Sequence, residues 1–318
     1  MITILTGGSG SAKFVRGLSK VLSQEKITAV VNVGDNIELF GLYVCPDIDT
    51  IMYALAGVLD IKKGWGLEED TFKLLEMLQR YGLETWFRLG DKDVATHIHR
   101  TFLLNRGHNL SQITKLLSTL LGIKAKILPA TDERIETKVV TKSGRMHLQE
   151  FWVKRKAQDE VLDVIYEGIE EAKPAVNVLE SIKNAEGIII SPANPVTSIE
   201  PILEVNGIRE ALIKRKEKTL AISPIIGNDP VSGPAGKLIH SLGIEVSASS
   251  IAELYEDILG TIIIDNSDIA LKEGIEKIGI KCVATNTLMK SFDDEKRLAD
   301  VAVEQLGVQK KRDEKVSL

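Results

Sequence analysis

The segment LTGGSGSAK, from Leu5 to Lys13, combines the residue types that bind a phosphate group. Small residues let a ligand approach the backbone, and glycine also adopts the left-handed conformation. Apolar residues precede the glycines and a helical apolar pattern follows them. We therefore expect a strand that turns into a helix N-terminus, where backbone N–H groups attract anions. The residues predicted to bind phosphate are Gly8, Ser9, Gly10, Ser11 and Lys13.

This glycine-rich turn does not match a complete nucleotide-binding motif. The Walker pattern GxxxxGK[ST] is absent, and the dinucleotide pattern GxGxxG is met only in its first half, by Gly8 and Gly10. A tight structural turn without a ligand is therefore the alternative. Other segments of the chain must decide between the two interpretations.

An acidic segment follows the next predicted strand. Asp35 ends the sequence VNVGD, and Asp47 and Asp49 stand directly before a predicted helix that begins near Thr50. Carboxylates beside a phosphate-binding turn are typical ligands of Mg²⁺, which neutralises charge during phosphoryl transfer. We predict Asp35 and Asp47 as metal ligands, and Asp47 or Asp49 as the acceptor of a proton from an attacking hydroxyl. Helix capping is the structural alternative for Asp47 and Asp49.

Two further loops follow predicted strands and carry polar side chains among prolines and glycines. They are SPANPVTSIEPIL at 191–203 and SPIIGNDPVSGPAGKL at 223–238. Loops after parallel strands meet at one edge of the sheet, so we expect both to join the glycine-rich turn in a nucleotide site. For either loop alone, an ordinary connection punctuated by proline and glycine is the alternative. The predicted nucleotide-binding residues are Ser191, Asn194, Thr197, Ser198, Gly227, Asn228 and Lys237.

The segment WFRLGDKDVATHIHR holds several charged and imidazole side chains. Arg88 precedes a break before the next helix, where its planar guanidinium can bind an acidic or carbonyl group of a ligand. An exposed surface charge is the alternative for Arg88. His97 and His99 are two positions apart and point in different directions on a helix, so we do not expect them to form a metal site together.

A repeating pattern of strands and helices must position these residues. Continuous apolar runs that end in small or polar residues begin near positions 2, 27, 187, 218, 261 and 280. Such runs are typical of parallel strands buried on both faces, so the expected fold is a doubly wound, mostly parallel Rossmann-like α/β sheet. We expect a single α/β catalytic domain over 1–307 and a charged, flexible tail over 308–318.

The middle third of the chain has a different pattern. Residues 67–81 and 111–121 are predicted to form amphipathic helices, the second of them capped by Ser111. Alternating apolar residues on both sides of positions 142–144 predict a β-hairpin. We therefore expect an inserted helical and hairpin subdomain at about 60–160.

Composition argues against several classes of protein. The 318 residues carry a net charge of −5, which does not favour nucleic-acid binding through a basic surface. Cys45 and Cys282 lie far apart, so we expect neither a disulfide framework nor a structural zinc site, in agreement with a cytoplasmic protein. No apolar run approaches the length of a membrane helix, and the first residues are expected to form a strand rather than a signal peptide.

The order of these segments resembles a known family. The blocks LTGGSGSAK, VNVGDN, PDIDTIMYALAG, WFRLGDKDVATH, LQEFWV, SPANPVTSIEPIL and SGPAGKL follow one another as in the 2-phospho-L-lactate transferases of coenzyme F-420 biosynthesis. The similarity extends from Met1 to about Gly307. It is the combination of the blocks that is specific, rather than any single block.

The resemblance implies a reaction and its partners. Such enzymes transfer the phospholactate group of a lactate-linked guanosine diphosphate to the ribityl hydroxyl of the deazaflavin Fo and release GMP. The resemblance also implies a requirement for Mg²⁺, a homodimer, and Fo binding by Asp49 and Arg88. The guanine nucleotide would lie at the glycine-rich turn and at the loops 191–198 and 227–237. Whether the guanylylated three-carbon acid is lactate, enolpyruvate or glycerate stays open.

Two other functions fit parts of the sequence. Gluconeogenesis-factor proteins have a similar glycine loop and fold, bind UDP-sugars and act as regulators, but tend to carry DDGGSSG where this chain has GDNIELFG. An NAD-dependent dehydrogenase would need the third glycine of its fingerprint, although Asp35 lies about 25 residues past the glycine turn, near the spacing of a ribose-binding acid. The transferase is the predicted function.

Overall fold

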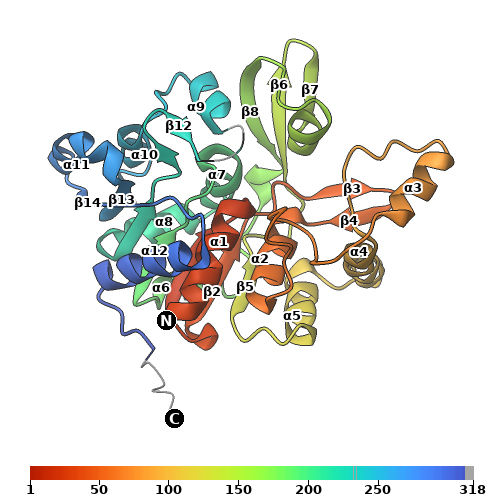
Figure 1. Cartoon of the computed structure of the whole chain (residues 1–318), viewed down its shortest axis with the longest axis horizontal. Helices are drawn as coiled ribbons and strands as arrows, with labels where there is room; N and C mark the ends of the chain where they lie inside the picture. The colour runs from red at the N-terminus through yellow and green to blue at the C-terminus, as the bar shows by residue number, and fades with distance from the viewer. Residues whose placement is uncertain (232, 234, 312–318) are drawn as a thin grey trace.

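A seven-stranded parallel sheet, in the order β14-β13-β10-β9-β1-β2-β5, forms the centre of the molecule (Figure 1). The computed structural model describes residues 1–231, 233 and 235–311, so positions 312–318 of the predicted tail lie outside the described residues. The strands of the central sheet are β1 (Ile2–Thr6), β2 (Ile27–Val31), β5 (Lys126–Pro129), β9 (Gly187–Ile190), β10 (Thr219–Ile222), β13 (Thr261–Asp265) and β14 (Lys281–Thr285).

The parallel α/β fold predicted from the sequence is confirmed. Every residue of β1, β2, β9 and β10 is buried, as continuous apolar runs require in strands that are covered on both faces. The edge strand β5 was not predicted, because its sequence KILP is short and ends in a proline. Proline is tolerated in β5 because the strand lies at the edge of the sheet, where a backbone donor can be spared.

Helices cover the sheet and connect its strands. α1 (Gly8–Val21) packs against α2 (Pro46–Ala56) and α12 (Phe292–Gln305) (Figure 1). Within the sheet, β2 lies next to β1 on one side. On the other side of β1, the strands β9, β10, β13 and β14 follow one another outward to the edge, so the chain crosses the sheet in the opposite direction there. Because such crossovers are right-handed, the helices of the second series lie on the face opposite α1. The second series contains α7 (Glu200–Leu203), α8 (Ile208–Ile213), α10 (Ala248–Leu254) and α11 (Lys272–Lys277).

The middle of the chain forms the helices and the hairpin that its pattern predicts, with different boundaries. The hairpin around 142–144 is formed by β6 (Glu136–Thr141) and β7 (Gly144–His147), and β8 (Val161–Glu167) adds a third strand. The helix predicted over 67–81 is shorter, since only α3 (Lys73–Arg80) is helical. The two remaining helices of this region are α4 (Asp91–Leu104) and α5 (Leu110–Leu120).

The predicted cap of the second amphipathic helix is wrong. α5 begins at Leu110, and Asn109 rather than Ser111 caps it, because Asn109 and Gln112 form a reciprocal capping box. Ser111 lies inside the first turn and donates its backbone N–H to Asp132.

No helix among the described residues is long and apolar enough to cross a membrane. Cys45 and Cys282 are both buried and free. The short elements are β3 (Ile37–Leu39), β4 (Leu42–Val44), β11 (Ile225–Ile226), β12 (Asp229–Pro230), α6 (Val178–Lys183), α9 (Ala235–Ser241), η1 (Gln24–Lys26), η2 (Glu150–Lys154), η3 (Ile169–Glu171), η4 (Pro195–Ile199), η5 (Lys216–Lys218) and η6 (Asn266–Leu271).

Candidate active site

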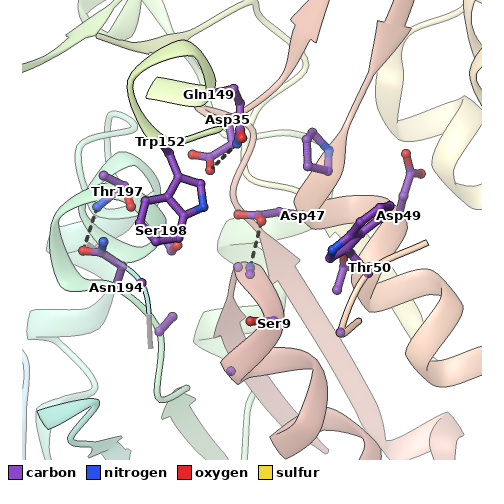
Figure 2. Close-up of a pocket in the computed structure, with 18 of the residues that line it drawn as sticks. Ser9, Asp35, Asp47, Asp49, Thr50, Gln149, Trp152, Asn194, Thr197 and Ser198 are labelled. Carbon is purple, nitrogen blue, oxygen red and sulfur yellow. Dashed lines mark hydrogen bonds between the residues drawn. The ribbon is translucent and has the colours of Figure 1, made fainter. Parts of the chain in front are cut away.

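A cavity of about 640 Å³ lies beyond the carboxyl ends of β1, β2, β9 and β10 (Figure 2). This is the position where open parallel sheets bind their ligands. The loops that follow these strands converge on the cavity, as the sequence predicts. The predicted site residues that line it are Gly8, Ser9, Gly10, Lys13, Asp35, Asp47, Asp49, Arg88, Asn194, Thr197 and Ser198.

The glycine-rich turn brings the N-terminus of α1 to the cavity wall. Gly8 has a φ of 72°, in the left-handed region that glycine adopts without strain. A Cβ atom at Gly10 would lie 2.6 Å from the backbone oxygen of Pro192, so only glycine allows this close approach of the two loops. The N-cap residue Gly7 has no side chain to cap the helix, and the Asp47 carboxylate accepts from the N–H of Gly8, the first residue of α1. The following residues Ser9 and Gly10 line the cavity, where the N-terminus of α1 can receive a further anion.

Two of the predicted phosphate-binding serines hold the turn rather than line the cavity. Ser11 is fully buried, donates its hydroxyl to the backbone oxygen of Gly7, and lies 2.6 Å from the hydroxyl of Ser191. Ser191 follows β9 and is equally buried. This contact ties the turn after β1 to the loop after β9. Neither serine lines the cavity, and phosphate binding by Ser11 and Ser191 stays a prediction.

Asp35 and Asp47 form a buried pair of carboxylates beside the turn. The amide nitrogen of Asn32 donates to both, at 3.0 Å to Oδ1 of Asp35 and 2.9 Å to Oδ2 of Asp47. The backbone N–H of Gly8 donates to Oδ1 of Asp47 at 2.8 Å, and the amide of Gln149 donates to Oδ2 of Asp35 at 3.1 Å (Figure 2). The phosphate turn and the acidic pair are thus directly hydrogen-bonded.

The electrostatics of this pair fit a divalent cation. Burial raises the pKa of the Asp47 carboxyl to about 6. Burial, and then repulsion from Asp47, raises the pKa of the Asp35 carboxyl well above its usual range. The hydrogen-bond donors that the described structure gives to the two carboxylates are all neutral groups, of Gly8, Asn32 and Gln149. Two buried carboxyl groups without a positive partner, whose negative charge is disfavoured by burial, favour a hard cation with oxygen ligands, such as Mg²⁺.

Asp49 has a different environment, on the far side of Asp47 from Ser198 (Figure 2). The guanidinium of Arg100, which is fully buried, donates to both of its carboxylate oxygens, with 3.0 Å between Nη1 and Oδ2. Burial disfavours the charge of Arg100, but the neighbouring carboxylate outweighs this effect and raises the pKa of the guanidinium. Asp49 is therefore held in one orientation by a bidentate ion pair.

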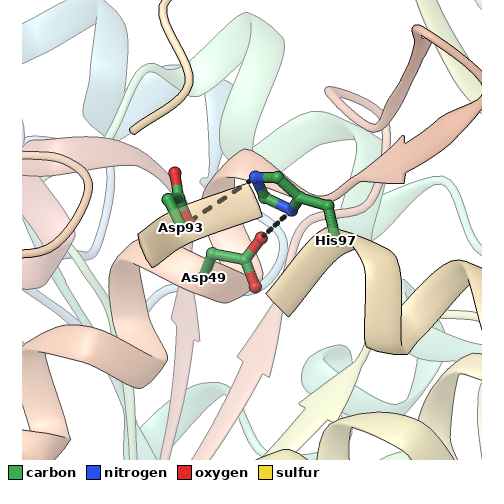
Figure 3. Close-up of side chains that lie close together, drawn as sticks. All are labelled: Asp49, Asp93 and His97. Carbon is green, nitrogen blue, oxygen red and sulfur yellow. Dashed lines mark ion pairs between the residues drawn. The ribbon is translucent and has the colours of Figure 1, made fainter. Parts of the chain in front are cut away.

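His97 and Asp93 extend this cluster (Figure 3). Nδ1 of His97 lies 3.6 Å from Oδ2 of Asp49, and its Nε2 lies 3.5 Å from Oδ1 of Asp93. The ligand atoms of Asp49, Asp93 and His97 lie within 4.8 Å of one another, so the group could hold a metal ion. The guanidinium of Arg100 opposes a cation there, and the hydroxyl of Tyr53 already donates to Asp93 at 2.7 Å. Asp35 and Asp47 offer a better cation site.

The two proline and glycine loops contribute unequally. Asn194, Thr197 and Ser198 line the cavity, although Oδ1 of Asn194 already accepts hydrogen bonds from the N–H groups of Val196 and Thr197 (Figure 2). The loop 223–238 also reaches the cavity, but not with the residues that the sequence predicts. The residues of this loop that line the cavity are Ser223, Pro224, Val231, Gly233 and Ala235.

The predicted residues of the loop 223–238 lie outside the cavity lining. The backbone N–H of Gly227 donates to the Asp268 carboxylate, and Nζ of Lys237 donates to the backbone oxygen of Ala157. Asn228 lies in the same short hairpin as Gly227, between β11 and β12. Nucleotide binding by Gly227, Asn228 and Lys237 stays a prediction.

Comparison with known proteins identifies the family. The family described as "2-phospho-L-lactate transferase CofD" matches residues 2–296. This chain belongs to the 2-phospho-L-lactate transferase family. It is 45% identical over 311 residues to the 2-phospho-L-lactate transferase of Methanocaldococcus jannaschii, covering 96% of this chain and 98% of that protein. It is also 41% identical to a phosphoenolpyruvate transferase of Streptomyces griseus, covering 95% of this chain and 97% of that protein.

A solved structure shares the fold of this chain. The crystal structure of protein BH3568 from Bacillus halodurans matches with a TM-score of 0.63 at 17% sequence identity, over 95% of this chain and 98% of the other. At this level of identity the likeness concerns the fold alone.

Within the transferase family, Asp49 and Arg88 are the residues that the sequence resemblance assigns to Fo. Both line the cavity. The guanidinium carbon of Arg88 lies 4.1 Å from the centre of the Phe72 ring, so Arg88 is held by a cation–π contact while its side chain remains exposed. The structure therefore brings Asp49 and Arg88 to one cavity and leaves their role a prediction.

Sequence reasoning missed several residues that build the site of this transferase-family chain. Asn32 and Gln149 orient the acidic pair, and Arg100 orients Asp49. The buried face of α4 carries Asp93, His97 and Arg100, which are spaced by four and then three positions. This spacing places the three side chains on one face of a helix and could have been detected in the sequence. The partner of that face, Asp49 on α2, is set by tertiary packing and has no local signal.

Proposed function

We propose that this chain transfers a phosphorylated three-carbon acid from its guanosine diphosphate ester to the ribityl hydroxyl of Fo, releasing GMP. One observation carries this proposal: the glycine-rich turn at the N-terminus of α1 and the buried pair of Asp35 and Asp47 meet in one cavity and are joined by the hydrogen bond from Gly8 to Asp47. That combination suits a diphosphate with a divalent cation rather than a free acid or an uncharged sugar.

The turn would bind the diphosphate of the donor. Backbone N–H groups at the start of α1 would donate to its oxygens, and Lys13, which lines the cavity one turn into the helix, would add a positive charge. The hydroxyl oxygen of Fo forms a bond to the phosphorus nearest the acid, and the bond from that phosphorus to the oxygen of GMP breaks. Such transfers depend mainly on positioning and charge neutralisation.

Asp35 and Asp47 would hold Mg²⁺, which when bound would neutralise charge on the transferred phosphate. The fit rests on the donor set, because both side chains are buried carboxylates without a positive partner among the described residues. Asn32 would keep the two carboxylates at a fixed separation. Asp47 would also tie the metal position to the phosphate turn through Gly8.

Asp49 would orient the nucleophile. Arg100 fixes the orientation of its carboxylate, and the imidazole of His97 lies next to the same carboxylate. A carboxylate held in this way can accept a hydrogen bond from the ribityl hydroxyl and receive its proton as the new P–O bond forms. The environment of Asp49 supports this role, while that of Asp47 supports the metal role.

The identity of the acid is the part of the proposal that needs an experiment. The family contains proteins named for phospholactate and for phosphoenolpyruvate. The protein is incubated with Fo, Mg²⁺ and guanosine diphosphate linked to lactate, enolpyruvate or glycerate in turn, and the products are identified by mass. We expect one donor to give a phosphodiester of Fo together with an equal amount of GMP. No product from any donor, with a protein that binds Fo, would contradict the proposed function.

Binding measurements beside this experiment separate the two alternatives. A UDP-sugar-binding regulator would bind UDP-sugars and form no Fo product, and a dehydrogenase would bind NADH tightly in calorimetry. The homodimer expected from the family resemblance is tested by light scattering of the purified chain.

A further inference from the structure

All three tryptophans of the chain line the one cavity that holds the candidate site. They come from separate segments: Trp65 follows α2, Trp86 precedes α4, and Trp152 lies in η2. Aromatic residues make up only 5% of the sequence, so this concentration of indoles in one place is a feature of the cavity rather than of the composition. Indole rings present large, rigid apolar faces that suit planar ligands.

Trp152 differs from the other two in its surroundings. Trp65 packs against Phe72, with 6.4 Å between ring centres, and Trp86 packs edge-on against Phe87 at 5.8 Å. Trp152 has neither an aromatic partner nor a cation over its ring among the described residues, and it remains 40% exposed. Part of this large side chain is thus left exposed in the cavity, without an aromatic or cationic partner on its ring.

The position of Trp152 is fixed by its neighbours in the chain. Phe151, directly before it, is fully buried in the main core and anchors η2. Gln149, at the start of the same segment, donates to Asp35 of the acidic pair. The partly exposed indole is therefore held at a set place relative to the proposed cation site.

Polar side chains line the same cavity as the indole of Trp152. Asn194, Thr197 and Ser198 are among them, and Figure 2 draws these residues and Trp152 on the side of Asp47 that is away from Asp49. A cavity that offers both an apolar ring face and hydrogen-bonding side chains suits a heteroaromatic ring, which has a π face and polar edge atoms.

We propose that Trp152 stacks on a planar heteroaromatic ring of a substrate and so determines which class of compound the cavity accepts. This inference rests on the proposed function, in which two substrates carry such rings: the guanine base of the donor and the deazaflavin of Fo. Trp152 acts in binding and not in the chemical step.

The test compares Trp152→Leu and Trp152→Phe with the unaltered protein in the presence of Mg²⁺. Dissociation constants are measured for guanosine diphosphate, for inorganic diphosphate and for Fo, the first two by calorimetry and the third by Fo fluorescence. Inorganic diphosphate is the matched probe, because it has the phosphates without a ring. Tyr81→Leu, at an exposed residue of the chain that does not line the cavity, is the control for handling and folding.

Stacking on guanine predicts that Trp152→Leu weakens binding of guanosine diphosphate by about 5- to 150-fold and leaves inorganic diphosphate unchanged. Stacking on the deazaflavin predicts the same loss for Fo alone. In either case Trp152→Phe should restore most of the affinity, since a phenyl ring keeps the π face. Equal losses for all three probes would show a structural role, and unchanged affinities would show no role; both results would overturn the inference.

Failure of this inference is distinguishable from failure of the proposed function. If the unaltered protein forms product from Fo and a guanylylated acid, the proposed function stands whatever the Trp152 variants do. If it forms no product but binds guanosine diphosphate through Trp152, the stacking residue stands and the reaction does not.

Discussion

The guanidinium of Arg100 donates to both carboxylate oxygens of Asp49, although the two residues are 51 positions apart in the chain. Asp49 comes from the first turn of α2 and Arg100 from the buried face of α4. Removing one partner of a buried ion pair leaves an uncompensated charge, which is costly. The pair therefore fixes the orientation of Asp49 at the same time as it joins two helices across the cavity wall.

Arg100→Met is expected to lower the free energy of unfolding by about 3–5 kcal/mol and kcat/KM for Fo by about 100-fold, because Asp49 loses its fixed orientation. Arg100→Lys should restore part of both quantities, since a lysine can pair with the carboxylate but not in bidentate geometry. Chemical denaturation and steady-state kinetics at low temperature measure the two effects.

Arg16 provides a matched control for Arg100. It forms a buried pair with Glu295 between α1 and α12, with 2.8 Å between Nε and Oε2, and it does not line the cavity. Arg16→Met should cost a similar free energy of unfolding while the folded enzyme keeps its kcat/KM within a few-fold. If the two variants lose activity equally, Arg100 contributes stability alone and the positioning of Asp49 is wrong.

Asp35→Asn is expected to remove the magnesium dependence of the reaction and to lower activity by about 100-fold or more. The substitution fits the local hydrogen bonds. The amide oxygen can still accept from Asn32, and Gln149 can rotate its own amide to accept from the new NH₂ group. Magnesium titration of the activity, and isothermal calorimetry of Mg²⁺ binding, measure the effect. An Asp35→Asn protein with the same half-saturating Mg²⁺ concentration as the unaltered one would exclude Asp35 as a ligand.

The acidic pair also predicts how pH changes stability. Because burial raises the pKa of Asp47 from 3.8 to about 6, and that of Asp35 well above its usual range, the folded protein holds more protons than the unfolded chain between about pH 4 and 6. The contribution of the pair to stability therefore falls as the pH rises through this window. Mg²⁺ competes with these protons for the two carboxylates, so it should restore the stability of the protein at pH values above this window.

We expect Mg²⁺ to raise the melting temperature more at pH 7.5 than at pH 5, by a difference of about 2–6 °C. In EDTA, Asp35→Asn should be more stable than the unaltered protein at pH 7.5 and similar to it at pH 5. Comparing the variant with the parent cancels other groups that titrate nearby, such as Glu200, whose pKa burial raises to about 7. Equal Mg²⁺ effects at the two pH values would contradict a metal site on this pair.

The sequence predicts most of the sheet and the edge at which the cavity lies, because both depend on local patterns. Apolar runs identify β1, β2, β9, β10, β13 and β14, and the residues directly after β1, β2 and β9 reach the cavity as expected. The sequence does not predict the strand β5, and it predicts a helix longer than α3. Both elements are short, so their sequence signals are weak.

The contacts that decide a residue's role are long-range and could not be predicted. Ser11 and Ser191 have the residue type of a phosphate ligand, but their hydroxyls face each other across 180 positions. Gly227 stands in a promising loop, but its N–H is bound by Asp268, 41 positions away. A local pattern shows which groups are available near an edge of the sheet. Only the packed structure shows which of them remain free for a ligand.

At Gly10 the sequence suggests a phosphate contact, and the structure adds a steric reason for glycine. Gly10→Ala places a methyl group 2.6 Å from the backbone oxygen of Pro192, which cannot move without the loop that carries Asn194. We expect a loss of about 1–3 kcal/mol in the free energy of unfolding, and diphosphate binding weakened at least about tenfold, because the turn and its N–H groups are displaced.

Gly274→Ala in α11 is the matched control, since a methyl group at this position would have no atom within 4 Å apart from its chain neighbours and the backbone of its own helix, and alanine favours a helix. It should leave binding unchanged and stabilise the protein by up to about 1 kcal/mol. Thermal melts and calorimetry with inorganic diphosphate measure both variants. A Gly10→Ala protein that binds diphosphate like its parent would show that the anion does not sit on the main chain of this turn, because a displaced turn cannot keep the same hydrogen bonds.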